Sequence, residues 1–145
     1  MSATVADFHP RALRVALRAV GLIFIVAIYP LTKIWPSGWA WHADGHSMYL
    51  DMILGLYATL GAFLLWAARD PARHVTLIWF AVWSSVVHAG IMTVQSLGDA
   101  HMRGHLYGDV LALVAVAAVL GWLTPRGARP GQPCGARELE SSHVR

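Results

Sequence analysis

Residues Met48–Leu97 read MYLDMILGLYATLGAFLLWAARDPARHVTLIWFAVWSSVVHAGIMTVQSL, and this stretch decides the fold. It contains two apolar runs, 48–68 and 75–97, joined by a short basic loop. A helix needs about 20 apolar residues to cross the roughly 30 Å hydrocarbon core of a bilayer, and each run is that long. Neither run shows the period-two alternation of a membrane β-barrel strand. The stretch therefore predicts a hairpin of two transmembrane helices.

Two further apolar segments flank the hairpin, at about 13–35 and 106–124. The first follows Arg11, Arg14 and Arg18, as in a signal peptide. No small-x-small cleavage site follows its apolar centre, so we interpret it as a membrane helix. The sequence thus predicts an all-α membrane protein, a four-transmembrane-helix bundle with helices at about 13–35, 48–68, 75–97 and 106–124, in one domain, 1–124.

The composition supports this class. The chain of 145 residues is 57% hydrophobic and 13% charged, whereas a soluble domain carries about 25% charged residues. Its net charge of +3 does not indicate nucleic-acid binding, because the basic residues lie at the ends of apolar runs and form no stripe. The expected environment is the lipid bilayer. The single cysteine, Cys134, excludes an internal disulfide and any Cys-x-x-Cys motif.

The basic residues also predict the orientation. One side of the membrane would hold nine of the 11 Lys and Arg residues: Arg11, Arg14, Arg18, Arg69, Arg73, Arg126, Arg129, Arg137 and Arg145. The positive-inside rule then places both termini in the cytoplasm of a bacterium, with the protein in its inner membrane. The tail 125–145, rich in Gly, Pro, Arg and Ser, is expected to be disordered. Trp35, Trp39 and Trp41 would mark the outer interface.

Polar side chains concentrate toward the outer half of the predicted bundle. The candidates for a ligand or proton site are His88, Asp51, Asp109 and Gln95. His88 lies near the bilayer midplane, within a helical stripe that also contains Gln95, so it should face the bundle or a wet cavity. Asp51 and Asp109 lie about one turn inside their helices. Purely structural roles also stay open for these residues. A carboxylate in the first turn complements the helix dipole, and His88 could serve only to tie helices together.

A metal site is a second hypothesis for the outer polar cluster. The pairs His42/His46 and His101/His105 have the i,i+4 spacing that places two imidazoles on one helix face. With methionines such as Met48 and Met92 they would suit Cu(I), and with carboxylates Zn(II) or Cu(II). The alternative is that these are ordinary loop and helix residues. We do not expect haem, because no helix interior other than that of His88 contains a histidine.

Small residues four positions apart predict where helices approach closely. These pairs are Ala58–Ala62 in the second span and Ala117–Gly121 in the fourth. Such spacing lets backbones come together in a membrane. The same spacing occurs often in any apolar helix, so these two faces are candidates for helix–helix contacts and no more.

Three motifs carry a family resemblance: AARDP at 67–71, WFAVWSSVVHAGIM at 79–92 and GHLYGDV at 104–110. The region from Met48 to Pro125 resembles an uncharacterised bacterial family of small four-helix integral membrane proteins, a domain of unknown function. The resemblance implies four helices and an inner-membrane location, and it implies no activity. His42 lies outside these motifs.

The residues leave three functional hypotheses. The first is a small accessory or interaction subunit that pairs with other membrane subunits or with copies of itself. The second is a protein that handles Cu or Zn. The third is an oligomeric proton-coupled carrier built around Asp51, His88 and Asp109. No nucleophile–base pair is present, so we expect no catalytic residues.

Overall fold

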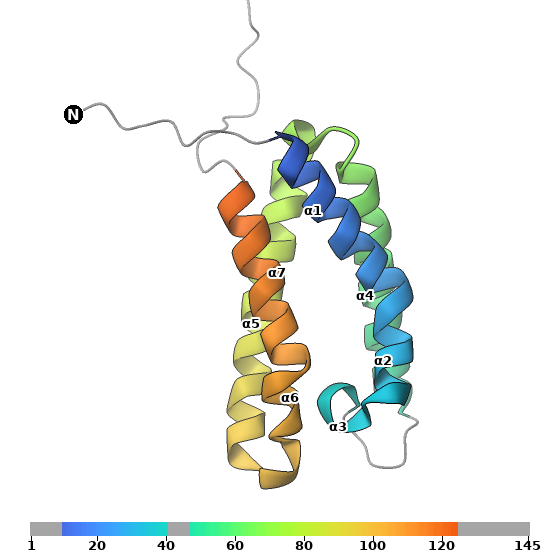
Figure 1. The fold of residues 1–145 in the computed structure, drawn as a ribbon, viewed down its shortest axis with the longest axis vertical. Coiled ribbons are helices and arrows are strands. Elements are labelled where there is room, and N and C mark those ends of the chain that lie inside the picture. The colour runs from blue at the N-terminus through green and yellow to red at the C-terminus, as the bar shows by residue number, and fades with distance from the viewer. Residues whose placement is uncertain (1–9, 41–46, 125–145) are drawn as a thin grey trace, which may run out of the picture.

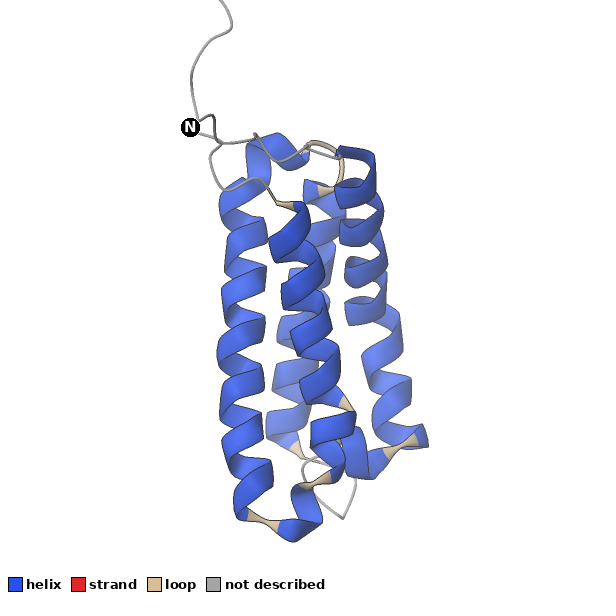
Figure 2. Cartoon of the chain, turned by 60° about the vertical axis from the view of Figure 1, so that its left-hand side comes forward, coloured by secondary structure: helices blue, strands red, loops and turns tan. Residues whose placement is uncertain are grey.

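The computed structural model describes residues 10–40 and 47–124, which form helices and short connections with no β-strand among them. Four helical segments in these ranges are long and apolar enough to cross a membrane: Arg11–Ile34, Met48–Ala67, Pro71–Gly98 and Gly104–Leu123. They run side by side along the bundle (Figure 2). The prediction of an all-α, four-transmembrane-helix protein is confirmed. The tail predicted at 125–145 lies outside the described residues.

The first span is not one regular α-helix. It consists of α1 (Pro10–Leu22), a π-helical turn η1 (Ile23–Ala27) and α2 (Ile28–Ile34). Trp35 then leaves the helix with φ −134° and ψ 72°, because a residue before a proline is disfavoured in the α region. The proline starts a single further turn, α3 (Pro36–Trp39).

The remaining spans follow in order: α4 (Met48–Ala67), η2 (Pro71–His74), α5 (Val75–Gly98), η3 (Ala100–Met102), α6 (Gly104–Tyr107) and α7 (Asp109–Leu123). The fourth span is broken at Gly108, where φ is −91° and ψ is −104°. Asp109 is therefore the first residue of α7. The sequence had instead predicted a position about one turn inside a continuous helix.

The helices pack as two pairs, α1 on α4 and α5 on α7 (Figure 1). At one end of the bundle, which we call the η2 end, α1 also contacts α7 and η2. The opposite end, the α3 end, is bridged by α3, which packs on α6 and η3. Between these two places of contact the pairs diverge (Figure 1).

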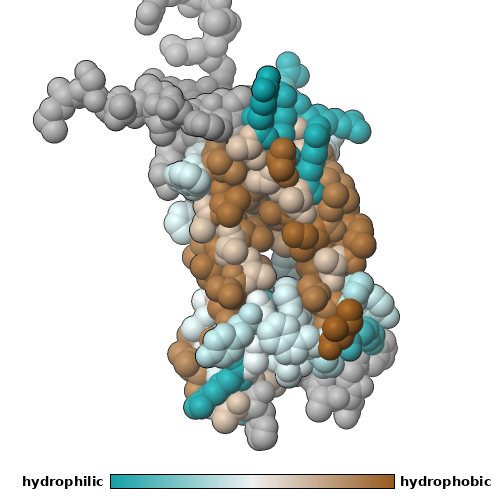
Figure 3. Space-filling model, in the orientation of Figure 1, coloured by the Kyte–Doolittle hydropathy of each residue, from teal (hydrophilic) through white to brown (hydrophobic). Residues whose placement is uncertain are grey.

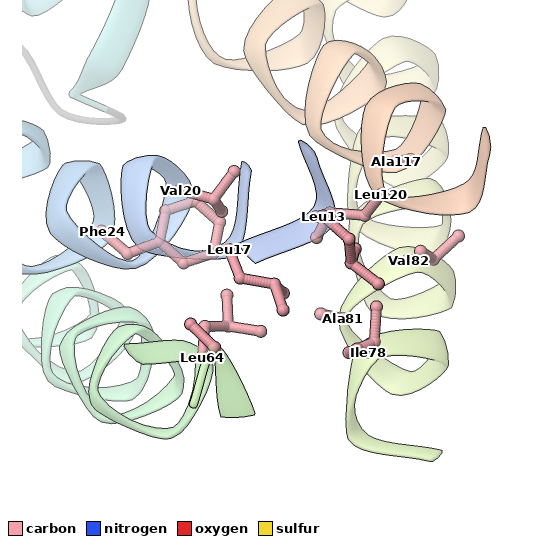
Figure 4. Close-up of a cluster of buried hydrophobic side chains, with 11 residues drawn as sticks. Leu13, Leu17, Val20, Phe24, Leu64, Ile78, Ala81, Val82, Ala117 and Leu120 are labelled. Carbon is pink, nitrogen blue, oxygen red and sulfur yellow. The ribbon is translucent and has the colours of Figure 1, made fainter. Parts of the chain in front are cut away.

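The main hydrophobic core lies in the η2 half of the bundle. Leu13 and Leu17 of α1 are almost completely buried, beside Leu64 of α4 and Ile78 of α5 (Figure 4). Leu120 brings α7 into the same cluster. This core joins both helix pairs, whereas the buried residues of a smaller cluster nearer the α3 end come from α5 and α7, with Tyr57 of α4 packed against them.

Large apolar side chains cover the outside of the bundle, including Trp83, Leu56 and Trp122, which are 62%, 71% and 82% exposed. They form a broad hydrophobic belt between more polar ends (Figure 3). A monomer in water rarely exposes so much contiguous apolar surface, so this belt fits immersion in lipid.

Candidate functional site

A chamber of about 290 Å³ lies between the two helix pairs, in the half of the bundle nearer the α3 end. Its walls come from η1, α2, α3, α4, α5 and α7. Most of the described lining side chains are aliphatic, and among them Trp39, Tyr57, His88 and Asp109 carry polar groups. Figure 3 shows the corresponding hollow at mid-height, between the two apolar walls of that face.

Two glycines of the fourth span position α3, and α3 positions Trp39. A Cβ atom at Gly104 would overlap the carbonyl oxygen of Ser37, and one at Gly108 would overlap that of Gly38. Because neither glycine carries a side chain, the backbone of α3 packs directly on α6. Trp39 then lines the chamber, and its buried indole N–H has no acceptor among the described residues. Trp39 thus faces the inside of the bundle, and its position at the outer membrane interface stays a prediction.

Tyr57 and His88 form the central polar contact of the chamber. The Tyr57 hydroxyl lies 2.9 Å from His88 Nδ1, so this contact links α4 to α5 near the middle of both helices. His88 Nε2 lies 2.8 Å from the sulfur of Met92. A thioether is only an acceptor. The tautomer that satisfies both contacts therefore has Tyr57 donating to Nδ1 and Nε2–H donating to Met92.

Asp109 enters the chamber from the first turn of α7 and is held in place by its neighbours. Its Oδ2 lies 3.0 Å from Nδ1 of His105, which is 1% exposed. Its Oδ1 accepts the backbone N–H of Val110 at 2.8 Å. His88 and Asp109 thus line one chamber, but the contact that the structure shows for His88 across helices is with Tyr57.

His88 also borders the outside of the bundle. Cavities of about 490 and 400 Å³ lie between α4 and α5, and both are lined by Ile53, Ser84 and His88. Ile53 and His88 line the chamber as well. The chamber also shares Leu50 and Met92 with the larger of these cavities and Tyr57 with the smaller. These side chains therefore lie between the chamber and the groove that the two outer cavities form between α4 and α5.

Comparison with known proteins gives this chain a family. Residues 9–141 match a family described as a family of unknown function, DUF6632. The chain belongs to this family. No curated protein and no solved structure matches it. The resemblance to an uncharacterised family is confirmed, and because DUF6632 carries no assigned activity, function has to be argued from the site.

In this DUF6632 protein, the residues of the polar stripe predicted on the third span do not share one environment. Met92 is buried beside His88. Gln95 is exposed and lines the groove between α4 and α5, away from the chamber lining. Asp51 is exposed in the first turn of α4 and is not among the chamber-lining residues. Of the four ligand-site candidates, the structure therefore brings His88 and Asp109 to one chamber.

The predicted metal ligands are only partly described. His42 and His46 lie outside the described residues, as does the side chain of His101. The chain from 101 to 105 is not one helix, because η3 ends at Met102 and α6 begins at Gly104. Met48 is 79% exposed at the start of α4. Within 10–40 and 47–124, no group of three or more His, Cys, Asp or Glu side chains is placed to hold a metal ion. The metal site stays a prediction.

Tyr57 and Trp39 line the candidate site, and the sequence did not single out either of them as a site residue. Tyr57 lies in the middle of an apolar run, where a tyrosine hydroxyl needs a partner. His88 lies at a comparable depth in the next helix, so matching depths would have suggested the pair. Nothing in the sequence signals the inward turn of Trp39, because it depends on how α3 packs on α6.

Proposed function

We propose that this protein is a small accessory subunit of the bacterial inner membrane that binds a neutral, lipophilic molecule in the chamber. The observation that carries the proposal is the chamber itself: apolar walls with four polar groups, 290 Å³ in volume. Small-molecule sites are concave and mostly apolar, with a few placed polar groups, and begin at about 300 Å³. The hollow meets the lipid-facing belt, so a ligand enters from the bilayer.

The chemistry of the lining favours binding over catalysis. Among the described residues, the lining contains no serine, threonine or cysteine to serve as a nucleophile. Both oxygens of Asp109 already accept hydrogen bonds, from His105 and from the backbone of Val110. A carboxylate held in place by two hydrogen bonds is well suited to shaping a site. The ligand is therefore held and presented to a partner subunit or a second copy of the chain.

The other two hypotheses have narrower support. Metal handling is supported by one preformed imidazole–carboxylate pair, His105 and Asp109, and it would need further ligands from His42, His46 or His101. Elemental analysis of the purified protein and of His105→Ala tests it. A proton-coupled carrier is supported by the shared chamber of His88 and Asp109, with Asp51 outside that chamber.

The experiment that tests ligand binding fills the chamber with a larger apolar side chain. Ala112 lines the chamber on α7, whereas Ala118, on the same helix, is exposed and does not line it. Wild-type protein, Ala112→Phe and Ala118→Phe are purified in a mild detergent. Neutral lipids retained by each are then extracted and quantified by mass spectrometry.

The wild type and Ala118→Phe should retain the same neutral species near stoichiometrically, and Ala112→Phe should lose it. Thermal unfolding of all three proteins shows whether the filled variant is folded. Equal retention by Ala112→Phe and Ala118→Phe would show that the chamber holds no ligand. Retention of no neutral species by folded wild-type protein would also refute the proposal.

A further inference from the structure

Two residues that line the chamber, Trp39 and His88, carry hydrogen-bond donors that lack strong acceptors. The Trp39 indole is a donor only, and its N–H is buried with no acceptor among the described residues. His88 Nε2–H is directed to the sulfur of Met92, which is a weak acceptor. Leaving a buried donor unsatisfied destabilises a protein. A ligand with acceptor oxygens would give the Trp39 N–H an acceptor. It would also offer His88 Nε2–H a stronger acceptor than the Met92 sulfur.

The same chamber excludes charged head groups. It lies within the membrane-spanning part of the bundle, where burying a charge is costly. Asp109 would repel an anion such as a phosphate or a fatty-acid carboxylate. Asp109 is the one carboxylate among the described lining residues, and it already accepts hydrogen bonds from His105 and Val110, so a cation would find few ligands in the chamber. The favoured ligand is therefore a neutral molecule whose acceptors are carbonyl oxygens.

The aromatic lining favours a flat ring. Phe24, Trp39, Tyr57 and His88 all line the chamber. The Phe24 and Tyr57 rings meet edge to face at 5.0 Å, and the Tyr57 and His88 rings lie 5.7 Å apart. Aromatic side chains bind flat rings through stacked and edge-to-face contacts. The chamber volume suits a ring with a few substituents, and a tail would leave through the hollow into lipid.

From these donors, this neutrality and this lining, we infer that the chamber binds the head group of a lipid-borne quinone, whose two ring carbonyls accept from Trp39 and His88. This inference rests on the proposed function, because it names the ligand class of the same chamber. The other membrane source of neutral carbonyl acceptors is the ester group of a diacylglycerol. It lacks the flat ring that the aromatic walls accommodate.

The test measures binding of three probes to the full chain in detergent by isothermal titration. They are ubiquinone-1, a prenyl-arene of the same shape without the two carbonyls, and dioleoylglycerol. The proteins are the wild type, Trp39→Phe, Met92→Leu, Ala112→Phe and the control Ala118→Phe. Ala112→Phe reports whether the chamber is the site, and Trp39→Phe reports whether carbonyl recognition occurs there.

Ubiquinone-1 should bind the wild type and Ala118→Phe equally and bind Ala112→Phe at least about 10-fold more weakly. Trp39→Phe should weaken it by about 2- to 12-fold, the range for one lost hydrogen bond, and leave the carbonyl-free arene unchanged. Met92→Leu should keep or tighten quinone binding, because it releases His88 Nε2–H. It also remains informative if Trp39→Phe fails to fold.

Two results would refute the quinone inference while leaving the proposed function intact. One is arene binding as tight as quinone binding, abolished by Ala112→Phe. The other is tighter binding of dioleoylglycerol than of ubiquinone-1, together with weaker dioleoylglycerol binding by Trp39→Phe than by the wild type. If Ala112→Phe weakens none of the probes, the chamber is not the site and both proposals fail.

Discussion

Gly21 of α1 and Gly61 of α4 lie against each other, backbone to backbone. A Cβ atom at Gly21 would lie 2.8 Å from the carbonyl oxygen of Gly61, and one at Gly61 would lie 2.7 Å from that of Gly21. The contact is therefore reciprocal, and neither position has room for a Cβ atom unless the helices shift. In a membrane, where lipid is as apolar as leucine, such close packing is a main source of helix association.

Gly61→Ala should lower the free energy of unfolding by about 1–3 kcal/mol, the usual cost of overpacking. The added methyl group would meet the Gly21 carbonyl and push α1 from α4. The matched control is Gly55→Ala on the same helix, where a Cβ atom would meet nothing within 4 Å. Unfolding in mixed detergent–SDS micelles measures both variants. Equal stability of the two would show that the glycine contact does not hold the pair together.

Tyr57→Phe should reduce stability by about 0.5–1.5 kcal/mol. The substitution removes the hydroxyl that meets His88 at 2.9 Å, and it keeps the ring that packs on Phe24. Tyr107→Phe is the control, because Tyr107 is 74% exposed. The same unfolding assay applies, and a Tyr57→Phe protein as stable as Tyr107→Phe would show that the hydroxyl does not tie α4 to α5.

A double-mutant cycle on His105 and Asp109 should give a coupling energy of about 0.5–3 kcal/mol. Their contact is 3.0 Å long, and the side chains are only 1% and 13% exposed. The comparison is Asp70 with Arg73, a pair at 3.1 Å whose side chains are 51% and 83% exposed. That pair should couple by less than about 1 kcal/mol, because water screens it. Similar coupling in both cycles would contradict this difference.

The four spans were predictable because hydrophobic length alone sets them, but the details inside each span were not. The break at Gly108 and the π-helical turn η1 depend on packing between helices. The spacing of Ala58 and Ala62 predicted a contact face on α4, yet Ala62 is exposed and Gly61 makes the contact. Periodicity locates small residues without saying which neighbour they meet.

Two of the four polar residues that line the candidate site, His88 and Asp109, were predicted from the sequence. His88 and Asp109 stood out because ionisable groups are rare inside membrane spans. Tyr57 was missed, although its central position in α4 was visible. Trp39 was assigned to the interface by its place near a helix end, and only the packing of α3 on α6 turns it inward.

The orientation is tested by reporter fusions. The positive-inside rule predicts that the N-terminus, the loop between α4 and α5, and the tail after Pro125 are cytoplasmic. Reporters active only in the cytoplasm should work at all three places, and a reporter active only in the periplasm should work after Ala40. Periplasmic activity at the loop between α4 and α5 would overturn the orientation and leave the four spans intact.

The last prediction concerns Gly108, which shapes the chamber without touching a ligand. A Cβ atom there would overlap the carbonyl oxygen of Gly38, so Gly108→Ala should push α3 away from α6 and displace Trp39. We expect ubiquinone-1 to bind this variant about 2- to 12-fold more weakly, as for a lost hydrogen bond. Gly98→Ala is the control, since a Cβ atom there would meet nothing within 4 Å.

Combining substitutions separates positioning from general damage. If Gly108 acts by holding Trp39 in place, Trp39→Phe should remove most of the effect of Gly108→Ala on quinone affinity, because the same hydrogen bond cannot be lost twice. Additive losses of affinity would mean that the glycine affects the chamber by another route. Unchanged affinity in Gly108→Ala alone, in a protein as stable as Gly98→Ala, would show that contact between α3 and α6 does not shape the site.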